Sequence, residues 1–249
     1  MIRFLVVLLA SLFCCACAAP AADTTPQRPK TSKDALRMLK HGNERFVRGW
    51  SRHPHAGRNW RRSLTAGQHP FATIVGCSDS RVPPELIFDT GIGDLFVIRV
   101  AGNVIDTDVA ASVEYGVQHL HTKLVVVLGH DSCGAVTAAV NQRCGLASHE
   151  PTQIRALLGR ITPALEGLDL RAPRPRLIRQ AVERNATLAA HDLADISELT
   201  KAMHHDNAQI VRAVYDIETG IVRWLGTIER PAQPLLPEHS KLPLVASAH

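Results

Sequence analysis

The chain has 249 residues, of which 45% are apolar and 4% aromatic, and its formal net charge is +5. This length and apolar content are sufficient for one substantial core, and they favour a single α/β domain. The positive charges are spread along the chain without a long basic run, and few aromatic rings are present for base stacking. The composition therefore argues against a protein that binds nucleic acid.

Residues 1–21 have the three-part layout of a secretory signal peptide, in which Arg3 precedes an apolar stretch and then small residues. The apolar stretch is too short to span a bilayer. We expect cleavage after Ala18 or Ala21, and lipoprotein processing at Cys15 is the alternative. The pattern predicts an exported, periplasmic protein whose mature chain has no integral membrane span.

The rest of the chain divides by composition into a linker, one domain and a tail. Residues 22–30 are rich in proline and threonine and indicate a linker, while the proline-rich residues 231–249 predict a disordered tail. The domain is expected to occupy residues 31–230. Its first segment, residues 32–49, has helical apolar spacing with Ser32 as the expected N-cap, and it predicts an N-terminal helical arm.

Apolar runs and helical patterns alternate along the domain. The runs are typical of strands that are covered on both faces, and they occupy residues 71–75, 94–100 and 124–128. Helices are expected over residues 108–120 and, with a break at the proline-rich residues 171–176, over residues 152–205. Residues 209–226 predict a hairpin that turns at residues 218–220.

This alternation predicts an α/β fold with a central, mostly parallel sheet flanked by helices, the N-terminal helical arm, and a C-terminal antiparallel strand or hairpin. Functional groups of such sheets collect at the carboxyl ends of the strands. Cys77 and Asp79 follow the first predicted strand, and His130 and Cys133 follow the third. We therefore expect these four side chains to meet at one point.

The cysteines indicate a metal site. Three of the six lie in the predicted leader, which leaves Cys77, Cys133 and Cys144, and an odd number argues against a disulfide framework. Cys77 and Cys133 with His130 form a soft set of two sulfurs and one nitrogen that suits tetrahedral Zn²⁺. Asp79 is the candidate for the fourth position, and Cys144 is expected to be an ordinary buried core residue.

Asp79 has a second candidate partner in Arg81. A guanidinium two residues away can hold the carboxylate in a bidentate pair, which a lysine could not reproduce. If Arg81 holds Asp79, zinc keeps three protein ligands and an exchangeable water. The simpler alternative is a surface ion pair that contributes less than about 1 kcal/mol.

Several segments together resemble the bacterial members of the β-class carbonic anhydrases. The segments are "LKHGNERFVRG" (39–49), "GCSDSRVPPELIFDTGIGDLFVIRVAGN" (76–103), "SVEYGVQHL" (112–120), "LVVVLGHDSCGAV" (124–136) and "AVYDIETGIVRWL" (213–225). They stand in the order and at the spacing of that family, and they cover nearly all of the chain after the leader.

The resemblance implies a reaction, a cofactor and an assembly. The reaction is the reversible hydration of carbon dioxide to bicarbonate and a proton by attack of zinc-bound hydroxide, with one Zn²⁺ per chain. Cys77, His130 and Cys133 match the zinc ligands, while Asp79 and Arg81 match a pair in which the aspartate either ligates zinc or binds the arginine. The family implies a homodimer or homotetramer with sites at the subunit interface, in which the helical arm embraces the partner.

The resemblance also assigns a substrate pocket. Gln68 matches a glutamine that hydrogen-bonds substrate or product, and Phe96 and Ala101 match residues that line an apolar pocket for CO₂. Gly134 matches a glycine whose backbone N–H faces the bound anion, which suits the start of a helix. Ile74 stands where some bacterial relatives have a tryptophan that helps to bind inhibitory bicarbonate, and this implies a resting site in which Asp79 is off the metal.

Two alternatives share these motifs. A related zinc hydrolase acting on CS₂ or COS would have the same residues and differ in access to the pocket. A non-catalytic zinc-binding homologue would keep the ligands and lose Asp79 or Arg81, both of which are present here.

Overall fold

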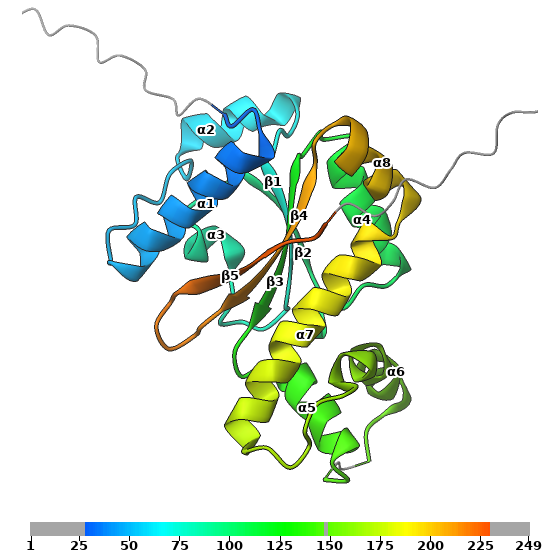
Figure 1. Ribbon diagram of the computed structural model, residues 1–249. Coiled ribbons are helices and arrows are strands. Elements are labelled where there is room, and N and C mark those ends of the chain that lie inside the picture. Colours follow the sequence, from blue (N-terminus) through cyan, green and yellow to red (C-terminus); the bar gives the residue numbers. More distant parts are fainter. Residues whose placement is uncertain (1–27, 147–148, 230–249) are drawn as a thin grey trace, which may run out of the picture.

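A five-stranded sheet in the order β2-β1-β3-β4-β5 forms the centre of the molecule (Figure 1). The computed structural model describes residues 28–146 and 149–229, so the predicted leader, most of the linker and the predicted tail lie outside the described residues. The strands are β1 (Ala72–Gly76), β2 (Leu95–Arg99), β3 (Leu124–His130), β4 (Gln209–Tyr215) and β5 (Val222–Thr227). The first four run parallel, and β5 is antiparallel to β4. The predicted fold class is confirmed.

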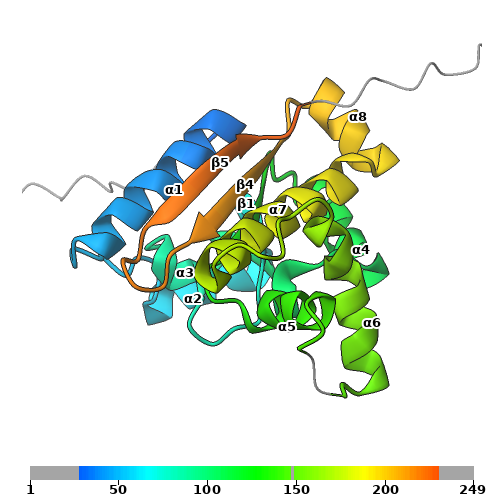
Figure 2. The same cartoon turned by 60° about the horizontal axis from the view of Figure 1, so that its bottom comes forward.

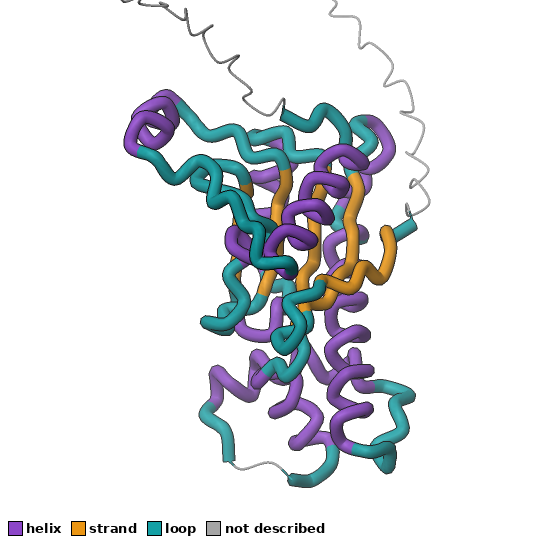
Figure 3. The backbone as a smooth tube through the Cα atoms, turned by 90° about the vertical axis from the view of Figure 1, so that its left-hand side faces the viewer, coloured by secondary structure: helices purple, strands orange, loops and turns teal. Residues whose placement is uncertain are grey.

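Helices cover both faces of the sheet and one of its ends (Figures 1 and 3). The α-helices are α1 (Ser32–Val47), α2 (Arg58–Ser63), α3 (Pro84–Ile87), α4 (Thr107–Gln118), α5 (Gly134–Arg143), α6 (Thr152–Ile161), α7 (Arg174–Ala194) and α8 (Ser197–His205). Short 3₁₀ helices lie at η1 (Leu64–Ala66), η2 (Ala101–Asn103) and η3 (Thr162–Leu165). None of the helices in the described part of the chain is long and apolar enough to cross a membrane.

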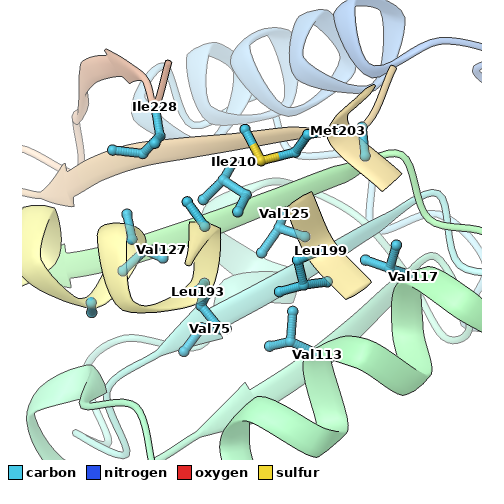
Figure 4. Packing of buried hydrophobic residues seen from close by; sticks show 14 of the residues in the cluster. Val75, Val113, Val117, Val125, Val127, Leu193, Leu199, Met203, Ile210 and Ile228 are labelled. Carbon is cyan, nitrogen blue, oxygen red and sulfur yellow. The ribbon is translucent and has the colours of Figure 1, made fainter. Parts of the chain in front are cut away.

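The central strands are buried because helices pack on both of their faces. Every residue of β1 and β3 is buried, which explains why their sequences are continuous apolar runs. On one face, Val75 and Val127 belong to a buried cluster with Leu193 of α7 and apolar residues of α4 and α8, as Figure 4 shows. The other face packs against α1 and α3, where Leu39 is buried.

The predicted N-terminal helix is present and lies along the sheet beside β5 (Figure 2). Its N-cap is Thr31, whose side chain accepts a hydrogen bond from the Asp34 N–H at 3.1 Å, so the expected cap at Ser32 is wrong by one residue. The Asn43 side chain donates to the Gly220 carbonyl at 2.8 Å and accepts from the Val222 N–H at 2.9 Å. The helix is thus tied to its own chain, and its predicted role in embracing a partner stays a prediction.

Helix α7 begins inside residues 171–176, where we expected a break in the helical region. Helix α7 starts at Arg174 because Pro173 is its N-cap and Pro175 lies in its first turn, where a missing N–H costs nothing. The predicted hairpin is confirmed as β4 and β5. The Asp216 carboxylate accepts hydrogen bonds from the N–H groups of Glu218 and Thr219 at 2.9 and 3.1 Å and so shapes the turn.

Candidate metal centre

Two neighbouring parallel strands end at the same edge of the sheet and bring three metal-binding side chains together. Cys77 directly follows β1, and His130 is the last residue of β3. The register pairs Gly76 with Leu128, so Cys77 lies almost level with His130. A sharp turn follows, in which Ser132 has a φ of 58°, and it places Cys133 at the N-cap of α5.

The three side chains form a closely spaced, buried group. The two sulfurs and one ring nitrogen of His130 lie within 4.8 Å of one another, and the exposed fractions of Cys77, His130 and Cys133 are 4%, 0% and 1%. A tetrahedral zinc ion with two sulfur ligands and one nitrogen ligand needs its ligand atoms roughly 3.8 Å apart. The chemistry and the spacing of the group therefore suit one zinc ion.

The imidazole of His130 is oriented as a ligand. Its Nδ1 lies 3.0 Å from the Asp131 carbonyl, to which it donates a hydrogen bond, and this leaves the lone pair on Nε2. Nε2 is buried and has no hydrogen-bond partner among the described residues. An unsatisfied buried acceptor costs about 1–3 kcal/mol. A metal ion at the centre of the group removes this cost.

The two thiols favour a cation between them. The Cys133 side chain, with help from His130 and the backbone of Asp79 and Gly102, lowers the pKa of Cys77 against the opposing effect of burial. The Gly102 N–H lies 3.3 Å from the Cys77 sulfur. Cys77 and burial in turn raise the pKa of Cys133. A thiolate at Cys77 thus disfavours ionisation of the Cys133 thiol. Both thiols ionise together only when a positive charge compensates their two negative charges.

Asp79 is held by Arg81 beside this group. The Arg81 Nε and Nη2 donate to the two carboxylate oxygens at 2.9 and 2.7 Å, and the Arg81 backbone N–H donates at 3.0 Å. The Arg81 guanidinium holds the pKa of Asp79 well below its usual range, so the carboxylate stays ionised and acts only as an acceptor. One carboxylate oxygen is 3.9 Å from His130 Nε2.

Asp79 is paired with Arg81 in the structure, which is one of its two predicted arrangements. The carboxylate is paired with Arg81, and its side chain is only 17% exposed. The simpler alternative was an isolated ion pair at the surface. The Asp79–Arg81 pair is instead bidentate, and its carboxylate lies beside the buried His130. The group thus offers three ligand atoms, from Cys77, His130 and Cys133, and the Asp79 carboxylate lies beside them.

Two further residues at the centre were missed from the sequence. Arg99, the last residue of β2, donates to the backbone carbonyls of Cys77 and Asp79 at 3.0 and 2.6 Å. Asn185, buried in α7, donates to the Gly102 carbonyl at 2.7 Å. Two features of the sequence could have indicated them: Arg99 is a charged residue at the end of an apolar strand, and Asn185 is a polar residue on the buried side of a helix.

Asn185 offers a stability prediction. Asn185→Ala leaves the buried Gly102 carbonyl without its donor, and we expect the free energy of unfolding to fall by about 1–3 kcal/mol. Urea denaturation of the purified protein measures this change, and Asn59→Ala at the exposed surface of α2 serves as the control. Equal midpoints for the two variants would show that the Asn185 contact contributes nothing.

The structure places Gln68 and Phe96 away from the metal centre of their own chain. Gln68 is exposed and precedes β1, whereas Cys77 follows that strand, so the five-residue strand separates them by about 16 Å. Phe96 lies near the start of β2, where its ring is 6.0 Å from that of Tyr115 in α4. Neither side chain joins the Cys77 group within one chain.

The remaining predicted residues have mixed placements. Ala101 is exposed in η2 beside Gly102, and Gly134 is the exposed first residue of α5, directly after Cys133. A Cβ atom added at Gly134 would meet no neighbouring atom within 4 Å, so there is open space beside this first residue of the helix. Cys144 is only partly buried, at the C-cap of α5, which corrects the expectation of a buried core residue.

Comparisons with known proteins agree on one family. A family profile described as "Carbonic anhydrase" matches residues 72–222. Carbonic anhydrase 2 of Mycobacterium tuberculosis is 58% identical over 106 residues, which cover 43% of this chain and 51% of that protein. A carbonic anhydrase of Synechocystis is 31% identical over 203 residues, which cover 75% of this chain and 70% of that protein.

The fold is shared with solved structures as well. The crystal structure of the β-carbonic anhydrase CafA of Aspergillus fumigatus superposes with a TM-score of 0.61 at 28% identity, covering 79% of this chain and 91% of CafA. The sequence match to the mycobacterial relative, by contrast, spans about half of that relative's length.

Proposed function

This chain belongs to the β-class carbonic anhydrases, and we propose that it catalyses the reversible hydration of carbon dioxide to bicarbonate and a proton. The observation that carries the proposal is the buried group of Cys77, His130 and Cys133 next to an ionised Asp79 that is held by Arg81. These residues supply a metal site and an oriented acceptor in one place.

Each group has a distinct role in the reaction. Cys77, His130 and Cys133 would hold the zinc ion, which would supply a Lewis acid that lowers the pKa of water to give a nucleophile at neutral pH. The Asp79 carboxylate, which only accepts, would accept a hydrogen bond from the O–H of the attacking nucleophile and so direct the oxygen lone pair toward CO₂. Arg81 holds the carboxylate in that position, and the open N-terminus of α5 at Gly134 favours the anionic product.

The substrate is tested by comparing three related molecules. We expect purified, zinc-loaded protein to hydrate CO₂ far faster than it hydrolyses COS or CS₂, when proton release is followed by stopped-flow with an indicator dye. A chelator should abolish the activity. Preference for COS or CS₂ would place the chain among the related hydrolases, and zinc binding with no turnover of any of the three would indicate a non-catalytic homologue.

The positions of Gln68 and Phe96 support a homo-oligomer. Gln68 precedes β1 and Phe96 lies near the start of β2, whereas the metal centre lies at the opposite ends of these strands. We propose that the two residues complete the site of a second copy of the chain. Edge strand β2 is apolar and only partly buried, which suits a subunit interface. The solved β-carbonic anhydrases of Sordaria macrospora are described as tetrameric.

Mixing two defective chains tests this arrangement. We expect Gln68→Ala to lower turnover and Cys133→Ser to abolish it. In a hybrid of the two, the Gln68→Ala chain keeps its metal ligands and receives Gln68 from its partner, so one site becomes complete. Activity after subunit exchange should therefore exceed the activity summed over the separate variants. No recovery in hybrids that sedimentation shows to have formed would mean that Gln68 does not act across an interface.

Export is the third part of the proposal. The basic residue, the apolar stretch and the small residues within residues 1–21 support a leader that carries the chain to the periplasm. N-terminal sequencing of the protein from a cell fraction distinguishes cleavage after Ala18 or Ala21 from lipid attachment at Cys15. An intact leader on cytoplasmic protein would contradict export.

A further inference from the structure

We propose that Arg99 is a positioning residue that fixes the backbone of residues 77–79 and thereby keeps the Asp79 carboxylate on Arg81. The inference rests on the proposed function, because Asp79 is the acceptor in that reaction. Arg99 itself does not touch the Asp79 carboxylate in the described structure: both of its hydrogen bonds go to backbone carbonyls.

The geometry is that of a two-point clamp. Arg99 ends β2 and pairs in register with Gly76, the last residue of β1. From there its Nε donates to the Cys77 carbonyl at 3.0 Å, and its Nη2 donates to the Asp79 carbonyl at 2.6 Å. One planar guanidinium thus holds two carbonyls that lie two residues apart. Lysine, with a single ammonium group, cannot reproduce this geometry.

The clamp acts on a turn whose conformation decides where the carboxylate points. The Asp79 carbonyl also accepts from the Val82 N–H at 3.0 Å, and the Asp79 carboxylate accepts from the Arg81 N–H at 3.0 Å. The carboxylate lies only 3.9 Å from His130 Nε2. A small movement of the turn is therefore enough to bring Asp79 onto the metal position, where it would take the fourth site.

The fold does not depend on this clamp. The pairing of β1 with β2 continues past the strands through a hydrogen bond from the Val100 N–H to the Gly76 carbonyl at 3.1 Å, and another from the Ser78 N–H to the Val100 carbonyl at 3.3 Å. These bonds do not involve the Arg99 side chain. Loss of the guanidinium is therefore expected to loosen the Asp79 turn while β1, β2 and Cys77 stay in place.

The test compares Arg99→Met and Arg99→Lys with Arg155→Met in the full chain. Arg155 also donates to a backbone carbonyl, that of Glu150 at 2.8 Å, but on the exposed surface of α6. We expect both Arg99 variants to keep zinc, to lose about tenfold to a hundredfold in kcat with little change in KM, and to exchange the amide hydrogens of Arg81 and Val82 faster. Arg155→Met should match the wild-type protein in each measurement.

Several outcomes would overturn the inference. These are native kcat and native amide exchange in Arg99→Met, full recovery in Arg99→Lys, and loss of zinc from either variant, which would assign Arg99 to holding the ligands instead. The amide exchange also separates this inference from the proposed function. If wild-type protein does not hydrate CO₂, the function fails, while the exchange of Arg81 and Val82 still shows whether Arg99 fixes the turn.

Discussion

Replacing Cys133 by serine removes zinc from the protein and, with it, the hydration of CO₂. Cys133 is 1% exposed and supplies one of the three ligand atoms, and a serine hydroxyl does not replace a thiolate on zinc at neutral pH. We expect zinc content well below one ion per chain and no measurable turnover. Elemental analysis and stopped-flow assays on the same preparation measure both.

The design of this variant separates loss of metal from loss of fold. Cys133 is the N-cap of α5, and serine is among the residues preferred at that position, so the helix is expected to persist in the circular dichroism spectrum. Cys144→Ser is the matched control, because Cys144 lies at the other end of the same helix and outside the ligand group. Full zinc occupancy in Cys133→Ser would refute the assignment of the ligands.

Replacing Arg81 by alanine removes most of the turnover and leaves zinc bound. Without the guanidinium, Asp79 loses both side-chain hydrogen bonds of the pair, and its carboxylate lies 3.9 Å from His130 Nε2. We expect Asp79 to occupy the fourth metal position and to exclude water, at a cost of about a hundredfold in kcat. The zinc content, measured beside kcat, should equal that of the wild-type protein.

The pH dependence gives a second check on this pair. In the wild-type protein Arg81 lowers the pKa of Asp79, so protonation of Asp79 does not limit activity in mildly acidic buffer. In Arg81→Ala the pKa of Asp79 moves back up toward its ordinary value unless the metal binds it. The double variant Arg81→Ala with Asp79→Asn is the control, because it has no carboxylate at position 79 that could bind zinc. Near-normal hydration by the single Arg81→Ala variant would show that Arg81 is only a neighbour of the site.

The sequence predicted the parts of this structure that depend on local pattern. The apolar runs marked β1, β2 and β3 to within two residues at each end, and the alternation with helices predicted the parallel sheet. From that topology alone, Cys77, His130 and Cys133 were expected at one edge. Arg81 could be paired with Asp79 because the two residues are close in sequence.

Contacts between distant segments were not predictable in this way. Arg99 acts through backbone carbonyls, and Asn185 reaches Gly102 from a helix far along the chain, so neither leaves a spacing pattern. The shift of the α1 cap from Ser32 to Thr31 has another cause, since both hydroxyl side chains suit an N-cap, and the Ser32 hydroxyl instead donates to the Asn207 carbonyl.

The placement of Gln68 could have been recognised from the sequence. Gln68 precedes the first strand and Cys77 follows it, so one extended segment separates them whatever the details of packing. The family resemblance assigned both residues to one site without saying whether they belong to the same chain. Strand direction shows that within a single chain they lie at opposite ends of β1.

The most direct test of the account is a zinc titration of the metal-free protein, with CO₂ hydration measured at each step. The group of Cys77, His130 and Cys133 predicts that turnover rises in proportion to bound zinc and stops rising at one ion per chain. Zinc that binds without producing turnover, or turnover that is the same with and without zinc, would contradict the account.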